Sequence, residues 1–170
     1  MIPLRGRPAT GRDAADIARI WNEGIDDRVA TFETEPRTAE GIARWMQEKE
    51  PRYPSIVVER DGSVVAWAAA SPYRARACYE GVGEFSVYVA RAARGQGAGR
   101  AAMEALIRAA AERGLWKLVS RVFPENAASR GLLRSVGFRE VGVYRRHAKL
   151  DGVWRDVVIV ERFVGDAARG

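Results

Sequence analysis

The apolar positions of the chain follow two different periods, and together they predict alternating helices and strands. Apolar residues that recur every three or four positions favour amphipathic helices over residues 13–27, 38–49, 98–113 and 126–135. Short apolar runs bounded by Gly, Pro or Asp favour strands over residues 4–9, 56–59, 64–70, 83–89, 116–123, 139–150 and 153–163. The order βααβββαβαββ predicts an α/β fold with a mixed central sheet of about seven strands and about four helices.

Tight turns and a strand–helix–strand unit organise this order. Asp61-Gly62 and Asp151-Gly152 are typical of hairpin turns. Ser71-Pro72-Tyr73 is expected to end the strand that precedes it. We expect a single domain over residues 1–165 and a short C-terminal tail over residues 166–170.

Composition excludes several classes of protein. With one cysteine, Cys78, and one histidine, His147, the 170 residues offer no disulfide framework and too few ligands for a structural metal site. No apolar run approaches the roughly 20 residues of a membrane helix, and the start of the chain, residues 1–5, lacks the apolar core of a signal peptide. We expect a cytoplasmic protein with no metal and no membrane partner.

The net charge of +6 arises almost entirely from arginine, because only three of the 28 basic residues are lysine. The arginines are spread from Arg5 to Arg169 among 22 acidic residues, without a basic run or tail. This distribution favours a solvated surface or a field that attracts small anions, and no nucleic-acid partner is expected. A nucleic-acid-binding module is the alternative that charge alone leaves open.

The most informative stretch is a strand that runs through a glycine-rich turn into a helix, residues 87–100. Free N–H groups in the first turn of such a helix bind anions, and glycines let a ligand approach the backbone. A phosphate-binding Gly-Lys-Ser/Thr sequence is absent, and a dinucleotide fingerprint fails because position 100 is Arg. The pattern that fits is Arg-x-x-Gly-x-Gly, at Arg94, Gly97 and Gly99. A turn that only caps a helix is the alternative.

This pattern resembles the acetyl-coenzyme A pyrophosphate loop of the GCN5-related N-acetyltransferase (GNAT) superfamily. The resemblance continues through Pro124–Ser129 and Ser135–Phe138, and the order of elements matches over nearly the whole chain. It implies that acetyl-coenzyme A is the cosubstrate. The cofactor-binding residues that it implies are Val87, Tyr88, Val89, Arg94, Gly95, Gln96, Gly97, Ala98, Gly99, Arg100, Asn126 and Ser135. Asn126 also suits a helix N-cap.

Within the superfamily the chain is most similar to the phosphinothricin N-acetyltransferases. Four segments carry this likeness: residues 30–34, 72–76, 83–89 and 150–157. Residues 130–157 look closest to the arsinothricin branch. The resemblance implies a homodimer that acetylates the α-amine of phosphinothricin, arsinothricin or methionine sulfoximine or sulfone, and thereby confers detoxification or resistance. A peptide or protein N-acetyltransferase of the same fold is the runner-up.

Acetylation of an amine requires a base, because most amines are protonated at neutral pH. Glu84 occupies the position of the catalytic glutamate of the group, with apolar neighbours that would desolvate it; a solvent-facing residue is the alternative reading. Relatives bind the oxyanion with backbone N–H groups near Val87 or Val89. The superfamily's general acid, Tyr or His, is replaced here by Leu133, so the acid is not assigned, and His147 is not placed in that role.

Substrate binding is expected to involve Arg74, Arg76 and Phe32, besides Glu84. The two arginines would point the same way in an extended segment, and guanidinium groups match carboxylate, phosphinate or arsinate oxygens. The alternative for Arg74 and Arg76 is that they are ordinary surface arginines. The alternative for Phe32 is a position in the core.

Overall fold

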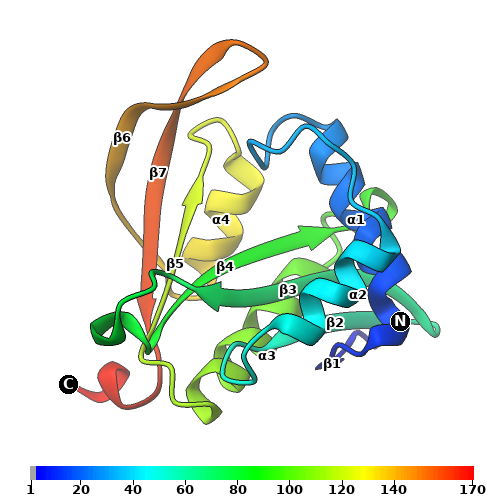
Figure 1. The fold of residues 1–170 in the computed structure, drawn as a ribbon, viewed down its shortest axis with the longest axis horizontal. Helices are drawn as coiled ribbons and strands as arrows, with labels where there is room; N and C mark the ends of the chain where they lie inside the picture. The colour runs from blue at the N-terminus through cyan, green and yellow to red at the C-terminus, as the bar shows by residue number, and fades with distance from the viewer. Residues whose placement is uncertain (1–2) are drawn as a thin grey trace.

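The computed structural model describes residues 3–170 and shows one central sheet with helices on both faces (Figure 1). The strands are β1 (Arg5–Pro8), β2 (Ser55–Arg60), β3 (Ser63–Pro72), β4 (Val82–Val89), β5 (Lys117–Val122), β6 (Arg139–Leu150) and β7 (Val153–Phe163). The α-helices are α1 (Ala14–Asp26), α2 (Ala39–Glu48), α3 (Ala98–Glu112) and α4 (Ala127–Ser135). The predicted fold class is therefore confirmed. Residues 1 and 2, which begin the expected domain, lie outside the described residues.

The sheet has the order β1-β2-β3-β4-β5-β7-β6 and mixes antiparallel and parallel pairs. All neighbouring strands are antiparallel except β4 and β5. The largest boundary difference from the sequence prediction is at the end of β3, which continues through Ser71 and Pro72. Ser71 and Pro72 pair with Glu84 and Gly83 of β4, so the tertiary partner extends the strand by two residues.

Each helix buries its apolar stripe against one face of the sheet. On one face, Ile17, Ile20 and Trp21 of α1 and Ile42 of α2 pack against Trp67. On the other face, a larger cluster joins Met103 and Leu106 of α3 and Leu133 of α4 to apolar residues of β2–β5 and β7. Within residues 3–170, no helix is long and apolar enough to cross a membrane. Gly165–Arg169, which overlap the expected tail, form a 3₁₀ helix.

The central strands β4 and β5 run parallel for only three residues. Val82–Glu84 pair with Lys117–Val119, and beyond this point the two strands separate (Figure 1). The second half of β4 therefore pairs with β3 alone. Its other edge pairs with no strand beyond Glu84.

A buried ion pair fixes the first strand to the first helix. The Asp13 carboxylate is 5% exposed and accepts hydrogen bonds from Arg7 Nη1 and Nη2 at 2.9 and 2.8 Å. These hydrogen bonds from Arg7 hold the pKa of Asp13 below its ordinary value. The stability they contribute is therefore present at neutral pH and is lost as the pH falls through the lowered pKa of Asp13.

We expect Arg7→Met to lower the free energy of unfolding by about 3 kcal/mol at pH 7, because the buried carboxylate loses its partner. As the pH falls through the lowered pKa of Asp13, the carboxyl group becomes protonated, so the difference from the wild type should shrink. Urea unfolding at pH 7 and at the lowest pH at which the wild type is still folded would measure both differences. An equal loss at the two pH values would contradict the ion-pair account and would assign the effect to packing of the arginine side chain.

Candidate active site

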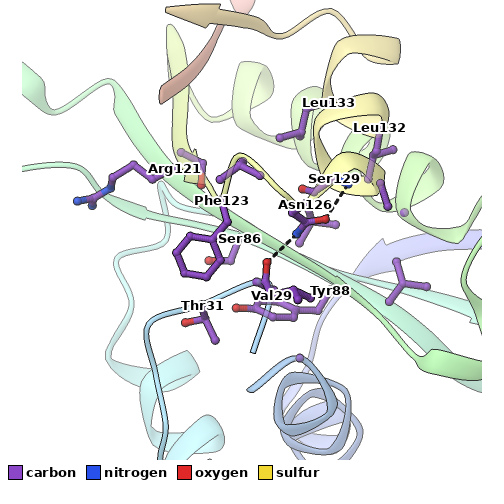
Figure 2. A pocket seen from close by; sticks show the side chains of 18 of the residues that line it. Val29, Thr31, Ser86, Tyr88, Arg121, Phe123, Asn126, Ser129, Leu132 and Leu133 are labelled. Carbon is purple, nitrogen blue, oxygen red and sulfur yellow. Dashed lines mark hydrogen bonds between the residues drawn. The ribbon is translucent and has the colours of Figure 1, made fainter. Parts of the chain in front are cut away.

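A cavity of about 880 Å³ occupies the space where β4 and β5 separate (Figure 2). Its size falls within the range of small-molecule and cofactor sites. One end is lined by the glycine-rich turn and the first turns of α3 and α4, and the other by β4, β5 and the loop after α1. The cavity therefore connects a potential anion site with side chains capable of acid–base chemistry.

The glycine-rich turn presents backbone N–H groups at one end of the cavity. Gly95 and Gly97 have φ angles of +72° and +86°, in the left-handed region that favours glycine. Gly97 is the N-cap of α3, and its carbonyl accepts the first helical hydrogen bond, from Ala101 N. The N–H groups of Ala98, Gly99 and Arg100 precede that bond, so they have no partner within the helix and are available to an anion.

Arg94, the first residue of the motif, ties this turn to the end of α1. Its Nη1 lies 2.7 Å from Asp27 Oδ2, and its Nε donates to Val89 O at 3.2 Å. Burial would raise the pKa of Asp27, but hydrogen bonds from Arg91 and Arg94 outweigh burial and lower it. Arg94 thus holds the turn in place through a carboxylate that stays ionised at neutral pH.

The open edge of β4 offers two further N–H donors. Backbone groups alternate in direction along a strand. The carbonyls of Phe85 and Val89 face the β5 side, since they accept from Ser120 Oγ and Arg94 Nε. The N–H groups of Val87 and Val89 therefore point into the gap between the strands, where they can stabilise an oxyanion.

Asn126 connects α4 to the loop after α1 across the cavity (Figure 2). Its Oδ1 accepts from Ser129 N at 3.1 Å, which is the N-cap expected from the sequence. Its Nδ2 donates to Val29 O at 3.2 Å. The side chain therefore already has partners on two elements, and the second N–H of Nδ2 can donate to a ligand.

Glu84 and Arg121 form an ion pair at the other end of the cavity. Glu84 is opposite Val119 in the parallel pair, so Arg121, two residues further along β5, lies on the same face of the sheet. Arg121 Nη2 donates to Glu84 Oε1 at 2.6 Å, and Arg121 Nη1 lies 3.4 Å from His147 Nε2. The Glu84 side chain is 34% exposed, so a substrate can reach the carboxylate.

Aromatic side chains form a wall between the two ends. The rings of Phe32 and Phe123 meet edge to face with centroids 4.9 Å apart. Tyr88, Thr31 and Ser86 lie close by in Figure 2 and line the same cavity. Burial raises the pKa of Tyr88 to about 12, so its hydroxyl is neutral at physiological pH and serves as a hydrogen-bonding group.

Comparisons with known proteins agree with this geometry. The model of the family "Acetyltransferase (GNAT) family" matches residues 17–138, which include the turn, α4 and both strands of the cavity.

The chain belongs to the GNAT acetyltransferase family.

Individual relatives indicate which acetyltransferases of the family this chain is similar to. The chain is 30% identical over 160 residues to a phosphinothricin N-acetyltransferase from Streptomyces viridochromogenes, covering 94% of this chain and 87% of the relative. It is 29% identical over 157 residues to an L-methionine sulfoximine/L-methionine sulfone acetyltransferase from Pseudomonas paraeruginosa, covering 91% of each. A crystal structure of a phosphinothricin acetyltransferase from Sinorhizobium meliloti in complex with AcCoA superimposes with a TM-score of 0.90 at 27% identity, covering 98% of this chain and 91% of that one. These comparisons confirm the family resemblance and the enzyme class that the sequence suggested.

The cavity gathers most of the residues expected from the sequence. The predicted residues that line the cavity are Phe32, Glu84, Val87, Tyr88, Val89, Arg94, Gly95, Gly97, Ala98, Gly99, Arg100 and Asn126, and Leu133 lines it as well. The other four lie outside its lining. Gln96 bonds to Ala92 O, Ser135 bonds to Leu132 O, and both are exposed. Arg74 and Arg76 are exposed too, with the Arg74 guanidinium 5.1 Å from the centre of the Tyr73 ring.

Sequence reasoning did not single out Arg121, Phe123 or Thr31, although all three line the cavity. The sequence contained a feature that could have identified Arg121, because it is a charged residue inside the predicted strand at residues 116–123. Thr31 had a weaker one, because it lies within a segment that resembles the phosphinothricin group. Phe123 had none, since an aromatic residue at the end of a strand is most often part of the core.

Proposed function

We propose that this protein transfers an acetyl group from acetyl-coenzyme A to the α-amine of a glutamate-like amino-acid analogue, and thereby detoxifies it or confers resistance to it. Phosphinothricin, arsinothricin and methionine sulfoximine or sulfone are the candidate substrates. The observation that carries the proposal is that the α3 N-terminus and the Glu84 carboxylate open into one cavity. The names of the phosphinothricin and methionine sulfoximine acetyltransferase relatives support the substrate class.

The cosubstrate would occupy the end of the cavity lined by α3 and α4. Its pyrophosphate would accept hydrogen bonds from the N–H groups of residues 98–100, with the positive end of the helix dipole behind them. The pantetheine arm would follow the open edge of β4 and contact Asn126. Acetyl-coenzyme A supplies the thioester.

Glu84 would act as the base. It takes a proton from the substrate ammonium, directly or through one water molecule, and frees the nitrogen lone pair. That nitrogen forms a bond to the acetyl carbonyl carbon, while the N–H groups of Val87 and Val89 stabilise the oxyanion. The carbon–sulfur bond then breaks, the thiolate leaves, and the nitrogen loses its second proton to water. Leu133 has no proton to donate, so the thiolate takes its proton from water or leaves without one.

The direct test is a thiol-release assay with acetyl-coenzyme A. The panel consists of phosphinothricin, arsinothricin, methionine sulfoximine, methionine sulfone, glutamate and a short peptide. Saturable turnover with one glutamate analogue supports the proposal and identifies the substrate. Turnover with the peptide alone would favour a peptide N-acetyltransferase, and acetyl-coenzyme A binding without any turnover would exclude the proposed substrate class. Light scattering would test the expected homodimer, and fractionation of the source cells would test the expected cytoplasmic location.

A further inference from the structure

The Glu84–Arg121 pair has the charge arrangement that an α-amino acid requires. In an α-amino acid, an ammonium group and a carboxylate group are attached to the same carbon atom. Glu84 Oε1 and Arg121 Nη2 lie 2.6 Å apart, so an anion and a cation stand side by side at the acceptor end of the cavity. A zwitterion placed against this pair would direct its ammonium towards Glu84 and its carboxylate towards Arg121.

Arg121 is the arginine in the right place for that carboxylate. Three arginines line the cavity in the part of the chain that the structure describes: Arg94, Arg100 and Arg121. Arg94 and Arg100 belong to the glycine-rich turn and the first turn of α3, where they pair with Asp27 and Glu104. Figure 2 shows the Arg121 side chain extending from β5 away from Asn126 and the α4 N-terminus. Of these three arginines, Arg121 is the one that contacts the proposed base, Glu84.

Arg121 can exchange its ion pair with Glu84 for one with a substrate carboxylate at little cost in free energy. The Arg121 side chain is 43% exposed, and an ion pair with this much solvent access contributes little to stability. The planar guanidinium fork offers parallel N–H donors that match the two oxygens of a carboxylate. His147 Nε2, 3.4 Å from Arg121 Nη1, limits the directions in which the fork can turn.

We infer that Arg121 binds the α-carboxylate of the acceptor and makes the enzyme specific for free α-amino acids. The inference rests on the proposed function and deepens it. A peptide N-terminus has a neutral amide in place of the carboxylate, and a simple amine has no acidic group at all. Both present the nitrogen to Glu84 but leave Arg121 without an anionic partner, so they bind more weakly. Arg74 and Arg76 are not required for this contact.

The test compares an active amino acid from the panel with its own α-carboxamide. For the wild type, KM for the carboxamide should exceed KM for the amino acid by roughly 30-fold, the value of a charge-assisted hydrogen-bond pair. Arg121→Gln should raise KM for the amino acid by a similar factor and change KM for the carboxamide by less than about threefold. Arg121→Lys should recover part of the difference, since lysine keeps the charge without the fork.

Arg52→Gln is the matched control. Arg52 is 41% exposed and pairs with Glu80 at 3.3 Å outside the cavity, so both KM values should stay at those of the wild type. An equal change of both KM values in Arg121→Gln would show a structural role and overturn the inference. The inference would also be overturned if the difference in KM between the amino acid and its carboxamide persisted in Arg121→Gln but disappeared in Arg74→Gln or Arg76→Gln.

Failure of the proposed function is distinguishable from failure of this inference. If no compound of the panel is acetylated, the proposed function is wrong, and calorimetric titration of phosphinothricin into the coenzyme A-saturated protein then decides about Arg121. Binding that Arg121→Gln weakens supports the carboxylate contact. Absence of binding, or binding that does not depend on Arg121, overturns it.

Discussion

Replacement of Glu84 by glutamine is expected to lower kcat by about 100- to 10,000-fold, the range typical of a lost general base. Glutamine keeps the size and the carbonyl oxygen of the side chain but cannot accept the ammonium proton. The cosubstrate end of the cavity is formed by other residues, so the Kd for acetyl-coenzyme A should change little. Steady-state kinetics with the best substrate of the panel, together with calorimetric titration of acetyl-coenzyme A, would measure the two quantities.

A matched control separates loss of the base from loss of an ion pair. Glu140 is 32% exposed, close to the 34% of Glu84, and pairs with Arg130 at 2.8 Å outside the cavity. Glu140→Gln therefore removes a similar ion pair and should leave kcat at the wild-type value. If Glu84→Gln retains more than about a third of the wild-type kcat, well outside the range for general-base loss, Glu84 is not the base.

Replacement of Gly97 by valine is expected to raise the Kd for acetyl-coenzyme A by roughly 50-fold, the value of one or two charge-assisted hydrogen bonds. Gly97 has a φ of +86°, which a β-branched residue rarely adopts. The backbone must shift to relieve the strain, and the N–H groups at the start of α3 then turn away from the pyrophosphate position. Calorimetric titration of acetyl-coenzyme A would measure the change.

The other end of the same helix provides the control. Gly114 follows α3 with a φ of +81°, and an added Cβ there would meet no atom within 4 Å. Gly114→Val therefore introduces a comparable backbone strain far from the cavity and should leave the Kd for acetyl-coenzyme A unchanged. Thermal unfolding of both variants would show whether their stabilities fall by similar amounts. An equal rise of Kd in both variants would mean that strain in α3, and not the position of the turn, weakens binding.

The number, type and order of the elements were predictable because local patterns determine them. Each helix buries one apolar stripe, and the hairpin turns contain Asp-Gly. Hydrophobic periodicity and turn residues are therefore sufficient to predict these elements. The glycine-rich turn was predictable for a similar reason, because its conformation depends on the backbone of consecutive residues. The end of β3 was not, since only pairing with Gly83 and Glu84 extends it through Pro72.

The proposed acceptor site depends on residues that are distant in the sequence. Glu84 and Arg121 are 37 positions apart and meet because β4 and β5 are parallel neighbours that pair for only three residues. The sequence places Arg74 and Arg76 close to Glu84 along the chain, yet the structure leaves both outside the cavity lining and brings Arg121 to it. Local sequence thus determined the family, the fold and the glycine-rich turn of this protein. Only the tertiary structure decided which charges line the cavity, because strand pairing and divergence bring those side chains together.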